Sequence, residues 1–433
     1  MAREMKDSGV KWIGTIPTSW NIQKVKTAFY RSKEEAHIED PVILSLARSG
    51  VKIRDISNNE GQLAESYYNY NPVVPGDLLL NPMDLYSGAN CSISKVSGVI
   101  SPAYINLRTR GNYCPAFYDY YFKTQYWAMA LFAHGKGVSF DNRWTLSPND
   151  LFNYYIPAPD YDEQQRIAEF LDRKCAEIDT VIEKTKTTIE EYKKLKQSVI
   201  TEAVTKGIRG NRPMKDSGIE WLCDIPVEWN IKRLKTMFGF GKGLPITKEN
   251  LIEAGASVIS YGQIHSKINT GIDIKPDLIR FVSEDYLTTN PNSLVNLGDF
   301  IFADTSEDLD GCGNNVYVGD ERQLFAGYHT ITLCSYEKID NSYLAYLFKT
   351  DCWRSQIRAK VSGVKLFSIS KKILSETSVL LPEENERREI VEYLNRKCAE
   401  IDKLIEDKTH LLEEMESYKK SVIYEYVTGK KQV

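Results

Sequence analysis

The chain has 433 residues, of which 42% are hydrophobic and 26% charged, and its net charge is −4. This composition predicts a globular protein of about two to four domains and excludes a general polycation, so any nucleic-acid site must be a local patch. No run approaches about eighteen apolar residues and the start of the chain has no apolar core, so we expect neither a membrane span nor a secretion signal. The eight cysteines are scattered without a C-x-x-C pair, and there are five histidines. We therefore expect no metal site, no disulfide framework and a cytoplasmic location.

The chain is a tandem repeat of domain size. Met5–Phe29 matches Met214–Phe238 at 14 of 25 positions, and Glu163–Gly207 matches Glu386–Lys430 at 22 of 45 positions. The region between the matched segments is 14 residues longer in the second half, because the offset grows from 209 to 223. That region shares only short anchors, such as the Gly-Asp pairs at 76 and 298. The two halves of the chain are similar at their beginnings and ends and differ in between. This pattern predicts that both halves share one fold, which carries a different binding surface in each half.

The opening segment of each repeat contains two tryptophans and an Ile-Pro pair, and we expect it to pack as a cap against a domain or a helix end. The middles predict mixed α/β regions. Short apolar runs bounded by Gly, Pro, Asn and Asp indicate strands, as in PVILSL, GDLLLN, ASVISYG and GDFIFAD. Helices are predicted at FYDYYFKTQYWAMALFA and NSYLAYLFKTDCWRSQI.

Two long helices are predicted at 161–210 and 385–433. Their apolar residues recur in steps of three, four and seven, which is the pattern of a coiled-coil seam. In the first helix the seam is Leu171, Cys175, Ile178, Ile182, Ile189, Tyr192, Val199 and Ala203. In the second it is Leu394, Cys398, Ile401, Ile405, Leu412, Met415, Val422 and Tyr426. A long helix cannot bury such a seam alone, so each helix is the natural partner of the other.

The charges on the seam favour an antiparallel pair. In a parallel pair, Lys196 would meet Lys419 in the same layer, and like charges would repel. In an antiparallel pair, Lys196 is expected near Arg396 and Lys397, outside the seam.

The whole pattern resembles the specificity subunit of type I restriction–modification enzymes. The resemblance rests on SGxxWxxxIPxxW at the start of each half and on EQQRIAEFLDRKCAEID followed by SVITEAVTKG in the first helix, with SVIYEYVTGKK at the end of the second. It implies an α+β fold in which two pseudo-twofold-related α/β target-recognition domains are separated by two long helices that form an antiparallel coiled coil. The implied domains are target-recognition domains at 1–160 and 211–384 and spacer helices at 161–210 and 385–433.

The resemblance also implies a function without catalysis. Each recognition domain would read one half of a bipartite, asymmetric target in double-stranded DNA, while the helices set the spacer and dock two methyltransferase subunits. Motor-nuclease subunits would complete the enzyme. S-adenosylmethionine, ATP and Mg²⁺ are expected on those partner subunits, and neither a cofactor nor a metal is expected on this chain.

Candidate DNA-binding residues are long polar side chains in loops after predicted strands, where Arg and Lys suit guanine and Gln or Asn suit adenine. A second group lies in basic segments that could contact phosphate, including a stretch from 352 to 375 that has no acidic residue between its ends. In the first half the candidates are Arg48, Ser49, Lys52, Arg54, Lys136 and Arg143. In the second half they are Gln263, His265, Lys267, Asn269, Arg358, Lys360, Lys365 and Lys371.

The word RKCAEID occurs in both long helices, at 173–179 and 396–402. Its cysteine and isoleucine serve the seam, but packing does not require the other positions to be identical. We therefore interpret the remaining residues as one handle presented to two copies of the same partner. These residues are Arg173, Lys174, Glu177, Asp179, Arg396, Lys397, Glu400 and Asp402.

Two other functions fit parts of the sequence. A DNA methyltransferase is suggested weakly by LLLNPMD at 78–84 and by the glycines of FGFGKG at 238–243. The first lacks the second proline and the aromatic residue of the methyltransferase N-P-P-[F/Y] loop, and the second lacks a clear preceding strand and a ribose-binding acid. A coiled-coil scaffold protein without DNA binding is the other alternative, but it gives no reason for divergence only in the middles.

Overall fold

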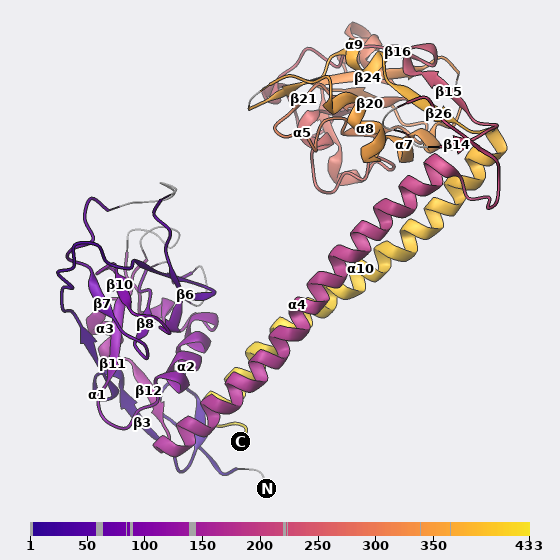
Figure 1. The fold of residues 1–433 in the computed structure, drawn as a ribbon. Helices are drawn as coiled ribbons and strands as arrows, with labels where there is room; N and C mark the ends of the chain where they lie inside the picture. Colours follow the sequence, from indigo (N-terminus) through magenta and orange to yellow (C-terminus); the bar gives the residue numbers. More distant parts are fainter. Residues whose placement is uncertain are drawn as a thin grey trace. The chain divides into compact units, whose positions relative to one another are not determined.

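The computed structural model describes residues 3–57, 64–83, 85–86, 90–137, 144–219, 222, 224–337, 339–363 and 365–433. The chain forms two compact units, and each combines one diverged middle with parts of both long helices (Figure 1). The first unit is Met1–Lys186 with Thr409–Val433, and the second is Thr187–Lys408. The predicted fold class, two α/β regions joined by long helices, is confirmed.

The first unit contains short strands around one longer helix. Its helices are α1 Val25–Ala28, α2 Pro115–Trp127, the 3-10 turn Phe132–His134 and α3 Pro148–Asn153. Its strands are β1 Met5–Asp7, β2 Thr15–Pro17, β3 Asn21–Lys24, β4 Phe29–Ser32, β5 Leu44–Ala47, β6 Gly50–Ile53, β7 Asn71–Val73, β8 Leu78–Leu80, β9 Cys91–Ile93, β10 Gly98–Ile100, β11 Ile105–Thr109 and β12 Tyr155–Ala158. Pro115 begins α2, where its fixed φ suits the first helical turn. Most aromatic side chains of α2 are buried, whereas Tyr120 and Trp127 are half-buried, and the helix packs against β9.

The second unit has more elements in its middle region. Its helices are α5 Tyr261–Ile264, α6 Tyr286–Thr289, α7 Ser342–Phe348, α8 Asp351–Arg358 and α9 Lys371–Ser375, with 3-10 turns at Leu234–Thr236, Lys248–Asn250, Pro276–Leu278 and Pro291–Ser293. Its strands are β13 Met214–Lys215, β14 Ile225–Pro226, β15 Asn230–Arg233, β16 Phe238–Phe240, β17 Ala256–Ile259, β18 Arg280–Val282, β19 Leu294–Val295, β20 Phe300–Ala303, β21 Thr305–Ser306, β22 Asn315–Tyr317, β23 Leu324–Ala326, β24 Thr330–Ser335, β25 Phe367–Ser368 and β26 Ser378–Leu381.

Both units are built on the same sheet topology although their middle sequences differ. An antiparallel sheet has the order β4-β11-β8-β9 in the first unit and β16-β24-β20-β22 in the second. The second unit has another four-stranded sheet, in the order β18-β17-β23-β19, in which β17 and β23 are parallel. Its counterpart in the first unit is the β5-β6 hairpin, which a parallel bridge between Ile43 and Val99 joins to the pair β10-β7. The diverged middles therefore share one frame.

The Gly-Asp anchors occupy the same place in both frames. Gly76 and Gly298 have φ values of 95° and 90°, which an L side chain rarely adopts, and they make the turn before β8 and β20. Asp77 is buried and accepts hydrogen bonds from the Arg108 guanidinium, at 2.8 and 3.0 Å. Asp299 is also buried and accepts one from the backbone N–H of Ser335, at 2.8 Å. These aspartates hold the sheets together, so they are not candidates for DNA reading.

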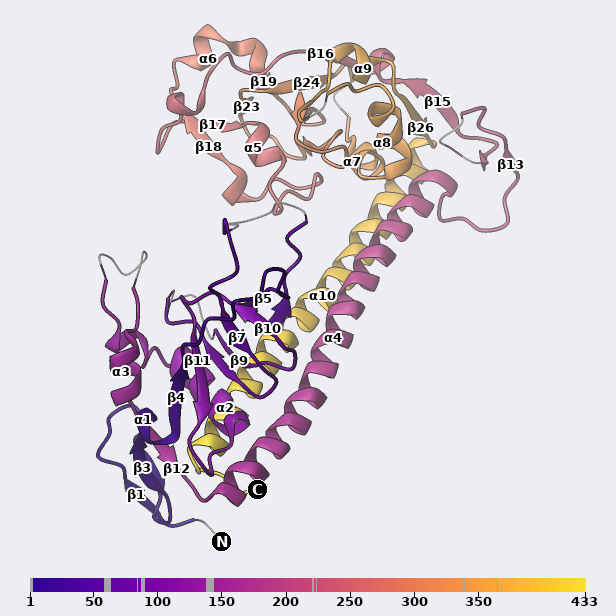
Figure 2. The same cartoon turned by 60° about the vertical axis from the view of Figure 1, so that its left-hand side comes forward.

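The long helices are α4 Tyr161–Lys206 and α10 Glu384–Val427. Figures 1 and 2 show them side by side in each unit. Every predicted seam residue is buried or half-buried. The thiols of Cys175 and Cys398 are buried, and this burial raises the pKa of both.

The helices are antiparallel, as the sequence predicted, but Lys196 does not lie where it was expected. Its Nζ bonds both carboxylate oxygens of Asp402, at 2.6 Å, and Asp402 lies more than one helical turn beyond Lys397. In the first unit, Lys419 bonds Asp179 in the same way, also at 2.6 Å. Each seam lysine is thus neutralised by the last residue of the repeated word on the other helix.

The opening segment of each repeat closes the ends of the helix pair, which confirms its predicted role as a cap. In the first unit, the indole N–H of Trp20 donates to Glu163 at 2.9 Å, and Arg3 pairs with the same carboxylate at 2.6 Å. Trp20 also lies against Gly429, just after α10 ends. We call Arg3, Trp20 and Glu163 the first clasp.

The second clasp is Arg212, Trp229 and Glu386. The Trp229 indole donates to Glu386 at 3.0 Å, and the Arg212 guanidinium bonds both oxygens of that carboxylate. Trp229 lies against Gly207, where α4 ends in a left-handed conformation with a φ of 80°. The equivalent residues therefore make equivalent contacts in the two units.

Among the helices of the described ranges, none combines the length and apolar composition that a bilayer crossing requires. No group of three or more His, Cys, Asp or Glu side chains in those ranges is arranged to hold a metal ion.

Candidate nucleic-acid interface

The first-unit candidates at 48–54 lie on the β5-β6 hairpin. Arg48 and Ser49 form its two-residue turn, and Gly50 follows with a φ of 108°. Arg48, Ser49 and Lys52 are exposed, whereas Arg54 is half-buried and its backbone N–H bonds the Ile43 carbonyl at 2.8 Å. Because both strands are fixed by four paired positions, the turn presents its side chains on a firm base.

The other first-unit candidates are Lys136 and Arg143. The Lys136 side chain is 81% exposed, and its Nζ lies 3.6 Å from the Asp150 carboxylate. An exposed pair at this distance contributes little energy, so Lys136 stays available for another partner. Arg143 lies outside the described residues.

Three of the four second-unit candidates at 263–269 are engaged inside the chain. The Gln263 side chain accepts from the Ser260 backbone N–H at 3.1 Å and completes the capping box that begins α5. Both ring nitrogens of His265 are in hydrogen-bond contact, one with the Thr305 carbonyl at 2.8 Å and one with Asn314 at 3.1 Å.

Asn269 is held in the same segment. Its amide donates to the carbonyls of Ile264 and Asn315, at 2.7 and 3.0 Å, and its oxygen accepts from Gly271. Lys267 alone of these four candidates is exposed. Base contacts through the Gln263 oxygen, the His265 ring or the Asn269 amide would require these internal bonds to break, so the exposed Lys267 is the candidate that the structure favours.

Several positive charges of the basic segment 352–375 are neutralised by acidic side chains that lie close to it in the fold. Arg358 bonds the Asp351 carboxylate at 2.9 Å and the Leu309 carbonyl at 3.0 Å, and Lys360 pairs with Glu376 at 3.3 Å. Arg354, in the same segment, is half-buried, and the desolvation of its guanidinium lowers its pKa to about 10. The sequence showed no acids inside the segment, but folding brings acids to it from both flanks.

Lys365 and Lys371 complete the predicted set. Lys365 is exposed. Lys371 begins α9, and its Nζ donates to the Phe240 carbonyl at 3.1 Å. The fold brings Lys371 beside a cavity of about 430 Å³ that Lys242 and His329 also line. Sequence reasoning missed these two residues because they are more than forty positions from Lys371 and from each other.

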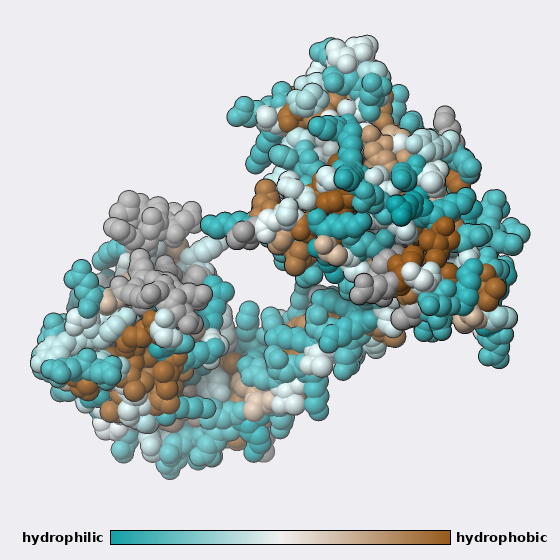
Figure 3. All heavy atoms as spheres, turned by 45° about the horizontal axis from the view of Figure 1, so that its top comes forward, coloured by the Kyte–Doolittle hydropathy of each residue, from teal (hydrophilic) through white to brown (hydrophobic). Residues whose placement is uncertain are grey.

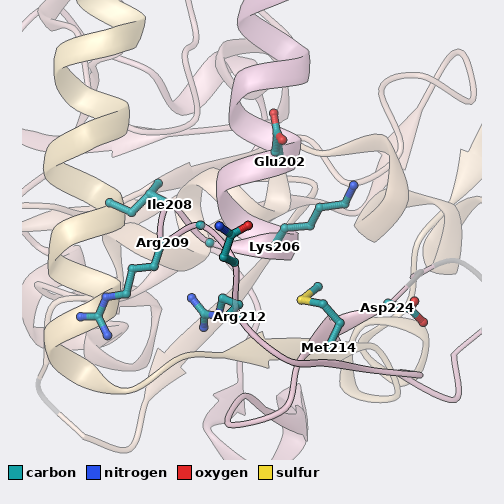
Figure 4. Close-up of a pocket in the computed structure, with 10 residues that line it drawn as sticks. Glu202, Lys206, Ile208, Arg209, Arg212, Met214 and Asp224 are labelled. Atoms are coloured by element: carbon teal, nitrogen blue, oxygen red, sulfur yellow. The ribbon is translucent and has the colours of Figure 1, made fainter.

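A larger cavity, of about 540 Å³, lies where α4 ends and the second repeat begins (Figure 4). Of its basic side chains, the two arginines are committed to ion pairs. Arg209 bonds Glu389 at 2.8 Å, and Arg212 bonds Glu386 and Glu228. This cavity therefore belongs to the second clasp and its link and not to a DNA-binding surface.

The repeated word on the helices forms the same local pairs twice. Lys174 bonds Glu177 at 3.1 Å, and Lys397 bonds Glu400 at 2.8 Å. Arg173 lies over the Phe170 ring, and Arg396 is exposed.

The last residues of the word, Asp179 and Asp402, have an internal role because they neutralise Lys419 and Lys196 across the helix pair. Packing thus supplies a reason for the identity of these two positions that sequence reasoning did not find. The candidate partner-binding residues that are not engaged across the helix pair are therefore Arg173, Lys174 and Glu177, with Arg396, Lys397 and Glu400 in the second copy. The cysteine of each copy is buried.

The segments that suggested a methyltransferase have structural roles. Asn81 is buried, and its side chain accepts from the Met83 N–H at 2.9 Å within a turn. Gly243 passes so close to Gly327 that a Cβ would overlap the Gly327 carbonyl oxygen. Gly243 thus allows two backbone segments to approach closely, which is a packing reason for this glycine.

Apolar side chains reach the surface at several places along the chain. Figure 3 shows hydrophilic side chains over most of the face in view, with hydrophobic groups between them. Exposed apolar residues recur at equivalent positions of the helices, as at Val181 and Leu404 and at Leu195 and Tyr418.

A protein-family model described as the type I restriction modification DNA specificity domain matches residues 226–414. Two proteins of Methanocaldococcus jannaschii are similar in sequence. The type I restriction enzyme MjaVIII specificity subunit is 26% identical over 284 residues, or 64% of this chain, and the putative type I restriction enzyme MjaX specificity subunit is 25% identical over 299 residues, or 67% of this chain. The chain spans 62% of the length of each of these relatives.

Two solved structures share the fold. One is from a study of complex assembly and conformational transition in the type I restriction–modification system, with a TM-score of 0.72, 14% identity and coverage of 96% of this chain and 99% of the other. The other is the HsdS subunit of Thermoanaerobacter tengcongensis, with a TM-score of 0.54, 14% identity and coverage of 96% and 98%. At such low identity the likeness is one of fold, and it extends over nearly the whole of each chain.

Proposed function

We propose that this chain is a member of the type I restriction–modification specificity subunits, which it resembles in sequence and fold, and that it is the DNA-reading and non-catalytic part of such a complex. In this proposal each unit reads one half of a bipartite, asymmetric target. The helices α4 and α10 set the spacer between the halves and dock two methyltransferase subunits. Double-stranded DNA is thus the ligand, and the complex acts on it in the cytoplasm.

The observation that supports this proposal most strongly is that the two units share one sheet topology but differ in the loop that connects two equivalent strands. The equivalent strands β5-β6 and β17-β18 are joined by a two-residue turn in the first unit and by 260–279 in the second. The first connection presents Arg48 and Ser49, and the second presents Lys267. Two readers on one frame can grip equivalent DNA backbone and still require different bases, because the bases are read by side chains and the backbone by the frame.

The repeated word supports two copies of one partner. Lys174 and Glu177 have the same local geometry as Lys397 and Glu400, and they lie on different units. A protein that recognises one pair can recognise the other with the same surface. We propose that S-adenosylmethionine binds these methyltransferase partners, and that ATP and Mg²⁺ act on motor-nuclease subunits in the full complex.

Methylome sequencing of cells that express this chain with its methyltransferase partner tests the proposal. We expect methylation at a split motif whose two halves differ. A continuous motif, or a perfect palindrome, would contradict two distinct readers. A matched control is the partner expressed without this chain, which should leave the motif unmethylated.

The helices as a ruler can be tested separately. Whole heptads inserted at equivalent positions of α4 and α10 keep the seam in register. The variant is expected to methylate the same two half-sites with a longer spacer. An unchanged spacer would show that the helix length does not set the distance.

A further inference from the structure

Three basic side chains from distant parts of the second unit line one cavity of about 430 Å³. Lys242 follows β16, His329 lies between β23 and β24, and Lys371 begins α9. The cavity walls are fixed by backbone bonds, since Gly243 donates to the Thr330 carbonyl at 3.2 Å and Leu244 donates to the Ala326 carbonyl at 2.8 Å. The three side chains therefore project from a firm backbone.

The charge around this cavity is positive on balance. Asp304 is the acid that lines it, and its carboxylate lies 3.4 Å from the His329 ring nitrogen. Among the described residues, no salt bridge engages Lys242 or Lys371. Lys371 uses one N–H for the Phe240 carbonyl and has two further donors, because an ammonium group carries three.

The backbone at His329 has a left-handed conformation that few residues other than glycine adopt. Its φ is 54°, in the left-handed region where glycine would avoid the steric cost. The side chain is 59% exposed, so it is not retained for packing in a core. Conformations of this kind concentrate at functional sites, which supports a role in binding for this ring.

We propose that Lys242, His329 and Lys371 form a binding site for a backbone phosphate of duplex DNA. This inference rests on the proposed function and names the place where the second unit holds its ligand. Lysine and histidine N–H groups around a cavity suit a phosphate, which offers oxygen acceptors and a negative charge. The site positions the duplex and does not distinguish one base from another.

The neighbouring aromatic residues connect this site with the candidate base-reading segment. Tyr261 is the first residue of α5. The centroid of its ring lies 5.5 Å from the centroid of the His329 ring and 6.1 Å from that of the His265 ring. The exposed Lys267 follows in the same segment. A phosphate held at the cavity would thus lie beside the connection that differs between the two units. The equivalent strand of the first unit, β4, is followed by Lys33, Glu34 and Glu35, so the first unit does not repeat this arrangement of charge.

The test uses the full chain in complex with its methyltransferase partner and measures the dissociation constant over a range of salt concentrations. The probes are a 40-base-pair duplex that carries the methylated motif and a duplex of the same composition in scrambled order. The variants are Lys242→Ala and Lys371→Ala. The matched control is Lys372→Ala, because Lys372 is an exposed neighbour that does not line the cavity.

We expect Lys242→Ala and Lys371→Ala each to weaken binding to both duplexes by the same factor. Each is also expected to reduce the slope of log K against log salt by about 0.9, the value for one phosphate contact. The control should keep the full slope. Lys242→Ala is the decisive variant because it removes no hydrogen bond within the described residues, so its folding is not at risk.

Two results would overturn the phosphate site. One is an unchanged salt slope in Lys242→Ala, and the other is a loss of affinity confined to the motif-bearing duplex, which would indicate base reading. Failure of the unsubstituted complex to bind either duplex would contradict the proposed function itself. The two failures are therefore distinguishable in one experiment.

Discussion

Removal of the Glu386 carboxylate is expected to destabilise the second unit strongly. Glu386 is 3% exposed, and it holds two buried groups at once, the Arg212 guanidinium and the Trp229 indole N–H. In Glu386→Ala the buried Trp229 indole loses its acceptor, and the buried Arg212 guanidinium keeps only the half-exposed carboxylate of Glu228. Breaking a buried pair in this way costs about 3–5 kcal/mol. For a unit of this size that cost lowers the melting temperature by roughly 6–20 °C.

The first clasp is a matched control in the same chain. Glu163 and Arg3 have side chains that are 16% and 17% exposed, so water replaces part of the lost interaction in Glu163→Ala. We expect about 1–3 kcal/mol for that variant. Scanning calorimetry gives the transition temperatures, and hydrogen exchange assigns each loss to the first or the second unit. Equal losses for the two variants, or a loss below about 1 kcal/mol for Glu386→Ala, would refute the reasoning from burial.

The same clasp predicts a dependence on pH. Burial raises the pKa of Glu386. The hydrogen bonds from Arg212 and Trp229 lower it by more than burial raises it, so the pKa lies below the usual value of 4.5. A group with a lowered pKa in the folded state stabilises the fold above its unfolded pKa, and that contribution is lost as the pH falls through the folded value. The second unit should therefore lose stability below about pH 4.5, and Glu386→Gln should flatten that part of the profile.

Three further outcomes are expected. Removal of Lys196 and of its carboxylate partner, singly and together, should give a coupling energy of about 0.2–1 kcal/mol in denaturant unfolding, because the pair is partly exposed; a larger coupling would contradict this. Gly243→Ala should cost more than about 1 kcal/mol, since its Cβ would overlap a backbone carbonyl, whereas Gly262→Ala has open space and should cost nothing. Reversal of charge at Glu177 and Glu400 together should weaken binding of the methyltransferase in sedimentation experiments without a change in helix content, and unchanged binding would return these residues to a helix-packing role.

The repeat and the helix seam were predictable from sequence because their signals are local and periodic. The antiparallel orientation followed from Lys196 alone, since a parallel pair would have placed it against Lys419. Its partner was predicted wrongly, because the seam pattern indicates which faces of the helices meet but does not fix which turns lie opposite each other. Sequence placed Lys196 near Lys397, and the structure places it on Asp402.

The candidate DNA-binding residues were less predictable. Several of them form hydrogen bonds inside the chain that would compete with DNA, and most of these bonds join segments that are distant in sequence. The partners of His265 come from Thr305 and Asn314, and no local pattern announces them. Gln263 is different. The sequence Ser-x-x-Gln at 260–263 is itself a capping-box signal, and it could have marked this glutamine as a helix cap.

The way the two units share α10 has a consequence for synthesis. The second unit is one continuous stretch, Thr187–Lys408, so all of its residues can fold before the chain is complete. The first unit begins earlier but is finished last, because its core includes Val422, Ile423 and Val427 from the end of α10. Domains usually fold in the order in which they are made. Here the first unit waits for the last turns of α10, so loss or modification of that part of the helix would damage the unit whose synthesis begins first.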